Sequence, residues 1–312
     1  MNSAITSLAR CPYTLRQLLL GTAYLLVPRR LPGLLPLVRV TLRDLLLPSA
    51  HIPDPREACE IPDGLCGLAR GLTVDDLLEG YARGMFVMSH IGPLKWWAPR
   101  HRMVLFFEGA HVEKTTRRLL RNKRFRVTFD TAFAQVVRAC ATPRAGGTPL
   151  TWITPRIESL FVESHTQGHA HSFEVWEGDA LVGGGFGIAI GRTFFTESQF
   201  HSARDASKVG FAVLNRHLQA WNFAFNDGKH ATRYLADAGM VPLTREEFSM
   251  VTARFAAEPG RMGRWNVDEA LLDDKWQPAE TAGLRMADVL PDGSRCRFSA
   301  EELLSTARSP TW

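Results

Sequence analysis

The sequence predicts an α+β fold built around an antiparallel meander that is followed by a helix and a further strand. Three runs rich in β-branched and aromatic residues are the predicted strands of the meander: 172–176, 180–190 and 193–200. Short turns that contain Gly178 and Gly191 join these runs as hairpins. A helix over Asp205–Trp221 and a strand over Phe223–Lys229 then return the chain to the sheet, which describes a mixed, layered core.

Further helices are predicted from capping residues and apolar periodicity. Their ranges are 73–84, 113–123, 130–142 and 154–168, with one more that ends at Gly239. Thr73 and Thr154 are good N-cap residues, and either Asp130 or Thr131 is the expected cap of the third helix. The residues 151–153 are expected to form a short strand or a sheet edge.

Glycines interrupt the middle strand of the meander at positions 183, 184, 185 and 187. Glycine weakens a strand interior, because it has no side chain to pack and loses more backbone entropy than other residues. We therefore expect either that another group approaches this backbone closely or that the strand bulges there. A substrate groove is one candidate for the close approach.

The composition is that of an ordinary soluble globular protein. At 312 residues, 45% of them hydrophobic and 22% charged, the chain is long enough for one large domain or two smaller ones. Its five cysteines are scattered and have no zinc-like spacing, which favours a reducing compartment. His169 and His171 lack a third ligand at a sensible spacing, so we interpret them as structural and expect no metal.

The two ends of the chain differ from its centre. Residues 1–50 are rich in leucine and contain prolines at 28, 32, 36 and 48, which should preclude one long helix. We expect short helical pieces docked on the protein body; contact with a membrane surface or a partner is the less favoured interpretation. The apolar run 17–28 is too short to span a bilayer and precedes Arg29 and Arg30, so we expect a cytoplasmic protein. Residues 257–312 are expected to form a loosely docked tail.

Basic side chains cluster on the predicted helix over 113–123 and just beyond it. The cluster consists of Lys114, Arg117, Arg118, Arg121, Lys123, Arg124 and Arg126. The first four share one helix face, and the seven charges exceed the net charge of +5 of the whole chain. The pattern is typical of a site for a phosphate backbone. A solvated basic face is the alternative interpretation.

Large aromatic side chains gather between residues 86 and 107. Trp96 and Trp97 stand between Phe86 and the pair Phe106 and Phe107. Core filling is the usual role of tryptophan. A stacking wall for an adenosine or an apolar side chain is the functional alternative.

Several local strings together point to a known family. They are Tyr81–Phe86, Trp96–Pro99, Thr151–Thr154, Gly168–Trp176, Leu181–Gly184, Glu197–Ser198, Phe200 and Ala206–Lys208. In order and spacing these strings resemble the leucyl/phenylalanyl-tRNA–protein transferase family. The resemblance covers roughly residues 60–250, and an ordered set of strings is much more specific than any one of them.

The resemblance implies a fold and a reaction. It implies a small N-terminal α/β domain over 51–105 and a catalytic domain of N-acetyltransferase-like (GNAT-like) fold over 106–256, with an extension at 1–50 and a tail at 257–312. Family members transfer an apolar amino acid from aminoacyl-tRNA to the free amino terminus of a protein or peptide, without metal or other cofactor. Because an aminoacyl ester is already activated, the enzyme must mainly orient the amine and stabilise the oxyanion.

The resemblance also implies where the catalytic residues lie. The family's Asp-x-Gln pair falls on Asp227 and Lys229, so the aspartate is kept and the glutamine is replaced, and Glu197 is retained. A glutamine amide both donates and accepts hydrogen bonds, whereas an ammonium only donates. Lys229 could therefore steady an oxyanion, and it could deprotonate an amine only if its pKa were lowered.

The implied substrate and tRNA contacts follow in the same way. The substrate-binding candidates are Tyr81, Met88, Trp96, Trp97, Trp152, Phe161, Gly185, Phe194, Gln199, His201 and Leu218. The tRNA-binding candidates are Lys114, Arg117, Arg118, Arg121, Lys123 and Arg124. Gly185 and Gln199 stand where the family has methionines, and His201 where it has a serine. The glycine should enlarge the pocket, and the two polar side chains favour a more polar acyl group.

Two other classes of function compete with this one. An acyl-CoA-dependent N-acyltransferase on the same fold should carry a glycine-rich phosphate loop before the helix that follows the meander, and the junction His201–Lys208 contains no glycine. A non-catalytic tRNA-binding descendant would keep the basic face and the aromatic residues while losing the catalytic pair. The change at Lys229 is compatible with that third interpretation.

Overall fold

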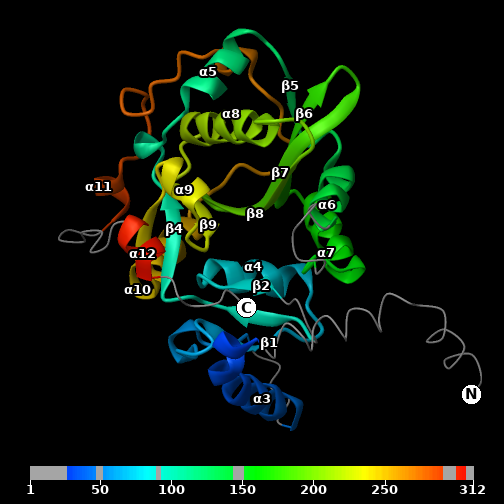
Figure 1. Cartoon of the computed structure of the whole chain (residues 1–312), viewed down its shortest axis with the longest axis vertical. Coiled ribbons are helices and arrows are strands. Elements are labelled where there is room, and N and C mark those ends of the chain that lie inside the picture. The colour runs from blue at the N-terminus through cyan, green and yellow to red at the C-terminus, as the bar shows by residue number, and fades with distance from the viewer. Residues whose placement is uncertain (1–26, 47–51, 89–92, 143–150, 291–299, 307–312) are drawn as a thin grey trace, which may run out of the picture.

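Two β-sheets form the framework of the molecule. The structure, a computed structural model, describes residues 27–46, 52–88, 93–142, 151–290 and 300–306 (Figure 1). A small sheet has the order β1-β3-β2, and a large one has the order β10-β4-β9-β8-β7-β6-β5. The large sheet is antiparallel except for the parallel pair β8 and β9. Together with the helices it makes a mixed α/β molecule, as the sequence predicts.

The elements have the following bounds. The strands are β1 (Leu65–Leu68), β2 (Phe86–Met88), β3 (Lys95–Trp97), β4 (His101–Leu105), β5 (Arg126–Phe129), β6 (Ala170–Glu177), β7 (Ala180–Ile190), β8 (Thr193–His201), β9 (Phe225–Lys229) and β10 (Val241–Thr244). The α-helices are α3 (Leu31–Leu46), α4 (Val74–Ala82), α5 (Lys114–Arg121), α6 (Phe133–Ala141), α7 (Pro155–Thr166), α8 (Ala206–Ala220), α9 (Arg233–Asp237), α10 (Arg245–Ala256), α11 (Met286–Val289) and α12 (Ala300–Thr306). Short 3-10 helices are η1 (Pro28–Arg30), η2 (Pro55–Glu57), η3 (Phe107–Gly109) and η4 (Glu269–Leu271).

The predicted meander is confirmed. β6, β7 and β8 pair antiparallel in sequence order, and α8 then carries the chain to β9, which lies parallel to β8. The caps at Thr73 and Thr154 are also confirmed, since each threonine hydroxyl accepts a backbone N–H from the first turn of its helix. The predicted edge at 151–153 is wrong, because those residues are not part of a strand.

Both explanations for the glycines of β7 apply. The register of β6 against β7 shifts between Val175 and Trp176, which leaves Val182 of β7, next to Gly183, as the extra residue of a β-bulge. A Cβ atom at Gly187 would lie 2.4 Å from the carbonyl oxygen of Phe195, and one at Gly183 would lie 2.8 Å from the Cβ of Ala206. The groups that approach this backbone are therefore the protein's own.

Helices cover both faces of the large sheet (Figure 1). α8 lies across β6 and β7 on one face, with α5 packed against it; we call this the α8 face. α4, α6, α7 and α10 pack on the other, which we call the α4 face. Each face has its own core of buried apolar side chains, the first around Phe173, Phe194 and Trp265 and the second around Tyr81 and Phe195.

The N-terminal region differs from the expectation that prolines break it into short helices. α3 continues for 16 residues through Pro36. Pro32 lies in the first turn, where the N–H groups have no intrahelical partner, so only Pro36 removes a backbone hydrogen bond. The expected docking is confirmed for α3, which packs on β1. The backbone N–H of Leu68 donates to the Asp44 carboxylate of α3 at 2.8 Å.

The C-terminal segment is not loosely docked where the structure describes it. Trp265 and Val289 are at most 1% exposed, and the Trp276 indole donates to the Gln219 side chain at 2.8 Å. The backbone N–H of Trp265 donates to Asp130, which was expected to cap α6. Neither Asp130 nor Thr131 caps α6: the Asp130 carboxylate binds this segment and His171, and the Thr131 hydroxyl donates to the Phe129 carbonyl oxygen at 3.1 Å.

Two further findings concern the chain as a whole. None of the helices in the described ranges has the length and apolarity that crossing a membrane requires. Cys59 and Cys66 are free thiols, and Cys11 and Cys296 lie outside the described residues.

We predict that Gly80→Ala destabilises the fold although alanine is the better helix former. A Cβ at Gly80 would lie 2.2 Å from the buried indole of Trp96, whereas one at Gly109 would lie 3.7 Å from its nearest contact, the Gly239 carbonyl oxygen. Overpacking against a rigid ring costs about 1–3 kcal/mol, which exceeds the gain in helix propensity of up to about 1 kcal/mol. Denaturant unfolding should show a clear loss for Gly80→Ala, and a change within about 0.5 kcal/mol for Gly109→Ala as the matched control.

Candidate active site

A chain of buried charged side chains crosses the α4 face of the large sheet. Arg102, on β4, donates from its Nε and one Nη to the two carboxylate oxygens of Asp227 on β9. The two side chains are 1% and 0% exposed. A bidentate pair of this kind fixes the orientation of both groups.

The Lys229 side chain lies beside this pair. Its ammonium is 2.6 Å from Oε1 of Glu197 on β8, and it donates to the carbonyl oxygen of Thr196 at 2.8 Å. The Tyr81 hydroxyl of α4 donates to the same Glu197 oxygen at 2.7 Å. The backbone N–H of Lys229 donates to Asp227 at 3.0 Å, so the four side chains form one connected network.

Two β-bulges lie at this network. The β4–β9 register pairs Met103 with Lys229 and Val104 with Asp227, which leaves Gly228 as the extra residue. The β7–β8 register likewise leaves Glu197 as the extra residue between Thr196 and Ser198. Lys229 also adopts φ 64°, a left-handed conformation that is uncommon outside glycine. Bulges re-aim side chains and occur often beside active sites.

Burial alters the proton affinity of the network. Desolvation raises the pKa of Glu197 and lowers the pKa of Lys229, against the attraction between the two groups. Burial together with the neighbouring Glu197 charge raises the pKa of Tyr81 well above its ordinary value. The two shifts of Glu197 and Lys229 converge, so the ammonium gives up its proton more readily than an exposed lysine does.

Arg102 is the member of this network that the sequence interpretation missed. Besides Asp227, it donates to the carbonyl oxygen of Gly84 at 2.8 Å, and its guanidinium lies 4.8 Å and 4.3 Å from the ring centres of Phe86 and Phe248. The available signal was an arginine directly before the apolar run 103–107, which is unusual for a buried strand.

The predicted substrate-binding residues do not form one pocket. Tyr81, Trp96, Trp97 and Phe161 belong to the core on the α4 face, and Met88 and Trp152 pack against it. Phe194 and Leu218 belong to the core on the α8 face. Only four of the candidates are partly or fully exposed, namely Met88, Trp152, Gln199 and His201. Trp96 and Trp97 are 2% and 3% exposed and fill the core, whereas Trp152 keeps an exposed part.

Gln199 and Gly185 lie on the α8 face, opposite Glu197. The Tyr234 hydroxyl of α9 donates to the Gln199 side-chain oxygen at 3.4 Å. A Cβ atom at Gly185 would lie 2.7 Å from the Phe173 ring and 2.8 Å from Cγ of Gln199. The space that the glycine leaves is thus filled by these two side chains.

Part of the basic cluster is bound by the C-terminal segment and by β6. Arg117 donates to the carbonyl oxygens of Asp274 and Trp276, Arg121 pairs with the Asp274 carboxylate at 3.0 Å, and Arg124 pairs with Glu177. Lys114, Arg118 and Lys123 are exposed and have no carboxylate partner among the described residues. These three residues make up what we call the open basic face.

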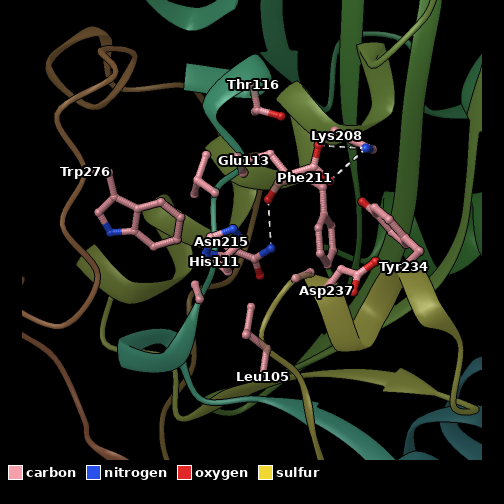
Figure 2. A pocket seen from close by; sticks show the side chains of 14 residues that line it. Leu105, His111, Glu113, Thr116, Lys208, Phe211, Asn215, Tyr234, Asp237 and Trp276 are labelled. Atoms are coloured by element: carbon pink, nitrogen blue, oxygen red, sulfur yellow. Dashed lines mark hydrogen bonds and ion pairs between the residues drawn. The ribbon is translucent and has the colours of Figure 1, made fainter. Parts of the chain in front are cut away.

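Two cavities lie apart from the buried network. A pocket of about 40 Å³ between α5, α8 and α9 holds the Lys208–Glu113 ion pair, whose shortest distance is 2.8 Å, beside Phe211 and Tyr234 (Figure 2). A larger one of about 370 Å³ lies between Leu94, just before β3, and Ile157 on α7. No cluster of three or more possible metal ligands is present in the part of the chain that the structure describes.

We predict that Arg102→Leu destabilises the protein by about 3–5 kcal/mol, because Asp227 would remain as a buried charge without a partner. The double variant Arg102→Leu/Asp227→Leu should recover much of this loss, since it removes both charges. Denaturant unfolding of the two variants measures the difference. Equal stabilities of the single and double variants would show that the buried charge is not the cause.

Comparisons with known proteins match the part of the chain that contains Glu197, Asp227 and Lys229. The family model described as leucyl/phenylalanyl-tRNA protein transferase matches residues 104–253. The chain is 43% identical over 212 residues to the leucyl/phenylalanyl-tRNA–protein transferase of Cellvibrio japonicus, which covers 68% of this chain and 90% of that protein. It is 39% identical over 231 residues to the transferase of the same name from Nitratidesulfovibrio vulgaris, covering 73% and 98%.

Similarity to solved structures is weak. The C-terminal domain of a putative lysylphosphatidylglycerol synthetase from Agrobacterium fabrum matches 59% of this chain and 58% of its own with a TM-score of 0.28 and 11% identity. That likeness carries no argument. The relatives named above are matched over nearly their whole length. On that similarity, this chain belongs to the leucyl/phenylalanyl-tRNA–protein transferase family.

Proposed function

We propose that the protein transfers an amino acid from an aminoacyl-tRNA to the free amino terminus of a protein or peptide. Family membership supports this reaction, and the observation that carries it is the buried network of Glu197, Lys229 and Asp227 within the matched region. Perturbed ionisable groups joined in a buried network are typical of catalytic sites.

The reaction needs positioning and proton transfer more than activation. The amine nitrogen attacks the ester carbonyl carbon, an amide bond forms, and the ester C–O bond breaks to release the 3′-hydroxyl of the tRNA. The proton lost by the amine balances the one gained by the leaving oxygen. A group near the carbonyl must donate to the oxyanion that forms in between.

Lys229 can serve either half of this reaction. Two of its three donors bind Glu197 and the Thr196 carbonyl oxygen, which leaves one for an oxyanion. Its pKa is lowered by burial, and Glu197 is a nearby proton acceptor, so the neutral amine can also take the proton of the attacking nitrogen. Asp227, held by Arg102 and by the backbone N–H of Lys229, fixes the position of this residue.

The identity of the acyl group is the least constrained part of the proposal. The sequence favours a polar group because Gln199 would be left unpaired by an apolar side chain. Gln199 already accepts a hydrogen bond from Tyr234, so that reason loses force. We therefore propose leucine and phenylalanine as the first acyl groups to test, as the family name indicates.

We also propose where the tRNA binds. The open basic face of Lys114, Arg118 and Lys123 contacts the tRNA phosphates, with a smaller contribution from Arg117, Arg121 and Arg124, which already have partners. The parallel pair β8 and β9, joined through α8, supports a GNAT-like catalytic core.

β4 pairs in the large sheet, which favours placing the boundary between the two domains near residue 100 rather than 105. We also propose a cytoplasmic location.

The transfer reaction can be tested directly. Purified protein, tRNA charged with leucine or phenylalanine, and a peptide with a basic N-terminal residue should give a peptide whose mass has increased by one aminoacyl residue. If no aminoacyl-tRNA serves while acetyl-CoA is consumed with an amine, the proposed function is wrong and the acyl-CoA-dependent reaction replaces it.

Replacement of Lys229 separates its two possible roles. We expect Lys229→Ala to lower kcat by about 100-fold or more, because a proton-transfer group or an oxyanion donor is lost. If Lys229 is the base, the activity of the parent protein falls as the pH drops below the lowered pKa of Lys229, because the ammonium cannot accept a proton. The Lys229→Gln variant should not show this fall in its pH–activity profile. Both proteins are assayed with the same acceptor peptide, so a pH dependence that comes from the amine of the peptide appears in both profiles. Full activity of Lys229→Ala excludes it from the mechanism.

The open basic face predicts a salt-dependent affinity. Each of Arg118→Ala and Lys123→Ala should weaken tRNA binding and lower the slope of log affinity against log salt by about one. Arg254→Ala, an exposed arginine on α10, is the control and should change neither. Filter binding between 50 and 200 mM salt, roughly the range in which phosphate contacts dominate, measures the slope. An unchanged slope in both test variants argues for a merely solvated face.

A further inference from the structure

Helix α3 carries an exposed apolar stripe at one end of the molecule. Its large side chains with the highest exposure are Leu31, Leu35, Val38, Leu42, Leu45 and Leu46, between 47% and 78% exposed. The first five follow one another at intervals of four, three, four and three residues, which places them along one side of a helix. Scattered exposed leucines are normal, but a continuous stripe indicates a surface that binds something apolar.

The orientation of the stripe is fixed by the opposite side of the helix. Gly33 and Val40 are buried, and the Asp44 carboxylate accepts the N–H of Leu68 on β1 at 2.8 Å. Arg43 also donates to the Cys66 carbonyl oxygen at 3.4 Å. α3 is therefore anchored on the small sheet through one face, and the leucines point away from it.

The exposed charge that borders the stripe is positive. Arg39 is exposed, stands at the border of the stripe and has no carboxylate partner in the described ranges. The sequence has six arginines and no acidic residue before Asp44, which is more than the whole net charge of the chain. A leucine stripe bordered by arginine is typical of helices that lie in the interface of an anionic bilayer.

A second copy of the chain is a poorer partner. A helix of 16 residues is about 24 Å long, so two copies that met along this stripe would bury roughly 500 Å², below the ~1,000 Å² expected of a stable interface. A nucleic acid offers no apolar surface to the leucines. A bilayer needs no matching partner surface, only apolar side chains and positive charge.

We propose that α3 is a membrane-surface anchor that binds anionic lipid bilayers through the stripe of Leu31, Leu35, Val38, Leu42 and Leu45. The helix lies along the bilayer with the leucines in the headgroup–acyl boundary and does not cross it. α3 and α5 lie at opposite ends of the molecule (Figure 1), so the open basic face stays accessible while α3 is bound. This inference does not depend on the proposed transfer reaction.

The test is co-sedimentation of the full chain with lipid vesicles. The protein should bind vesicles of equal parts phosphatidylglycerol and phosphatidylcholine, and much less to phosphatidylcholine alone. Leu35→Gln/Leu42→Gln should lower the affinity about tenfold or more, because two buried leucines are lost from the lipid contact. Met250→Gln, which changes an apolar residue of α10 with 50% exposure, is the matched control and should bind like the parent.

Two outcomes overturn the proposal. One is that the leucine variant, with an unchanged unfolding temperature, binds the anionic vesicles as tightly as the parent, which would place any lipid contact elsewhere in the chain. The other is that no vesicle is bound while sedimentation shows a dimer that the leucine variant abolishes. In that case the stripe is an interface between two copies.

Discussion

The rest of the site depends on the buried ion pair between Arg102 and Asp227. Two charges at 1% and 0% exposure are tolerated only when each satisfies the other and the remaining donors find partners, as Arg102 does at the Gly84 carbonyl. The pair joins β4 to β9 and connects the turn after α4 to the large sheet. It therefore holds Tyr81, at the end of α4, and Lys229, at the end of β9, at hydrogen-bonding distance from Glu197.

The bulge in β8 explains how near neighbours in one strand come to serve opposite faces of the sheet. Residues two apart share a face in a regular strand, as Asp227 and Lys229 do, whereas the extra residue Glu197 changes the face of the residues that follow it. A one-residue shift moves every following side chain across the sheet. The same effect places Gln199 with Tyr234 on the α8 face, although it is only two residues from Glu197.

These register effects set the limit of sequence-based prediction here. The meander, α5, α7 and α8 were predicted because periodicity and capping are local properties, and Asp227, Lys229 and Glu197 were named from strings that resemble a family. The strings contain no information on which face of the sheet a side chain occupies, so the substrate-binding candidates named from them come from both faces. Arg102 and the burial of Trp265 depend on contacts between distant parts of the chain, 125 and 135 residues apart, which no local pattern reveals.

A lysine at position 229, where the resemblance to the family implies a glutamine, is easier to understand once its surroundings are known. An ammonium in an apolar core would be costly, but here Glu197, the Thr196 carbonyl and the faces of Tyr81 and Phe86 surround it at 2.6 to 5.8 Å. Glu197 in turn keeps one carboxylate oxygen with no hydrogen-bond partner in the described part of the chain. A lysine with a lowered pKa beside an acid with a raised one can pass a proton in either direction, which an amide does not do. Relative to the glutamine that the resemblance implies, a lysine here changes how the network could move a proton and keeps a hydrogen-bond donor at the same place.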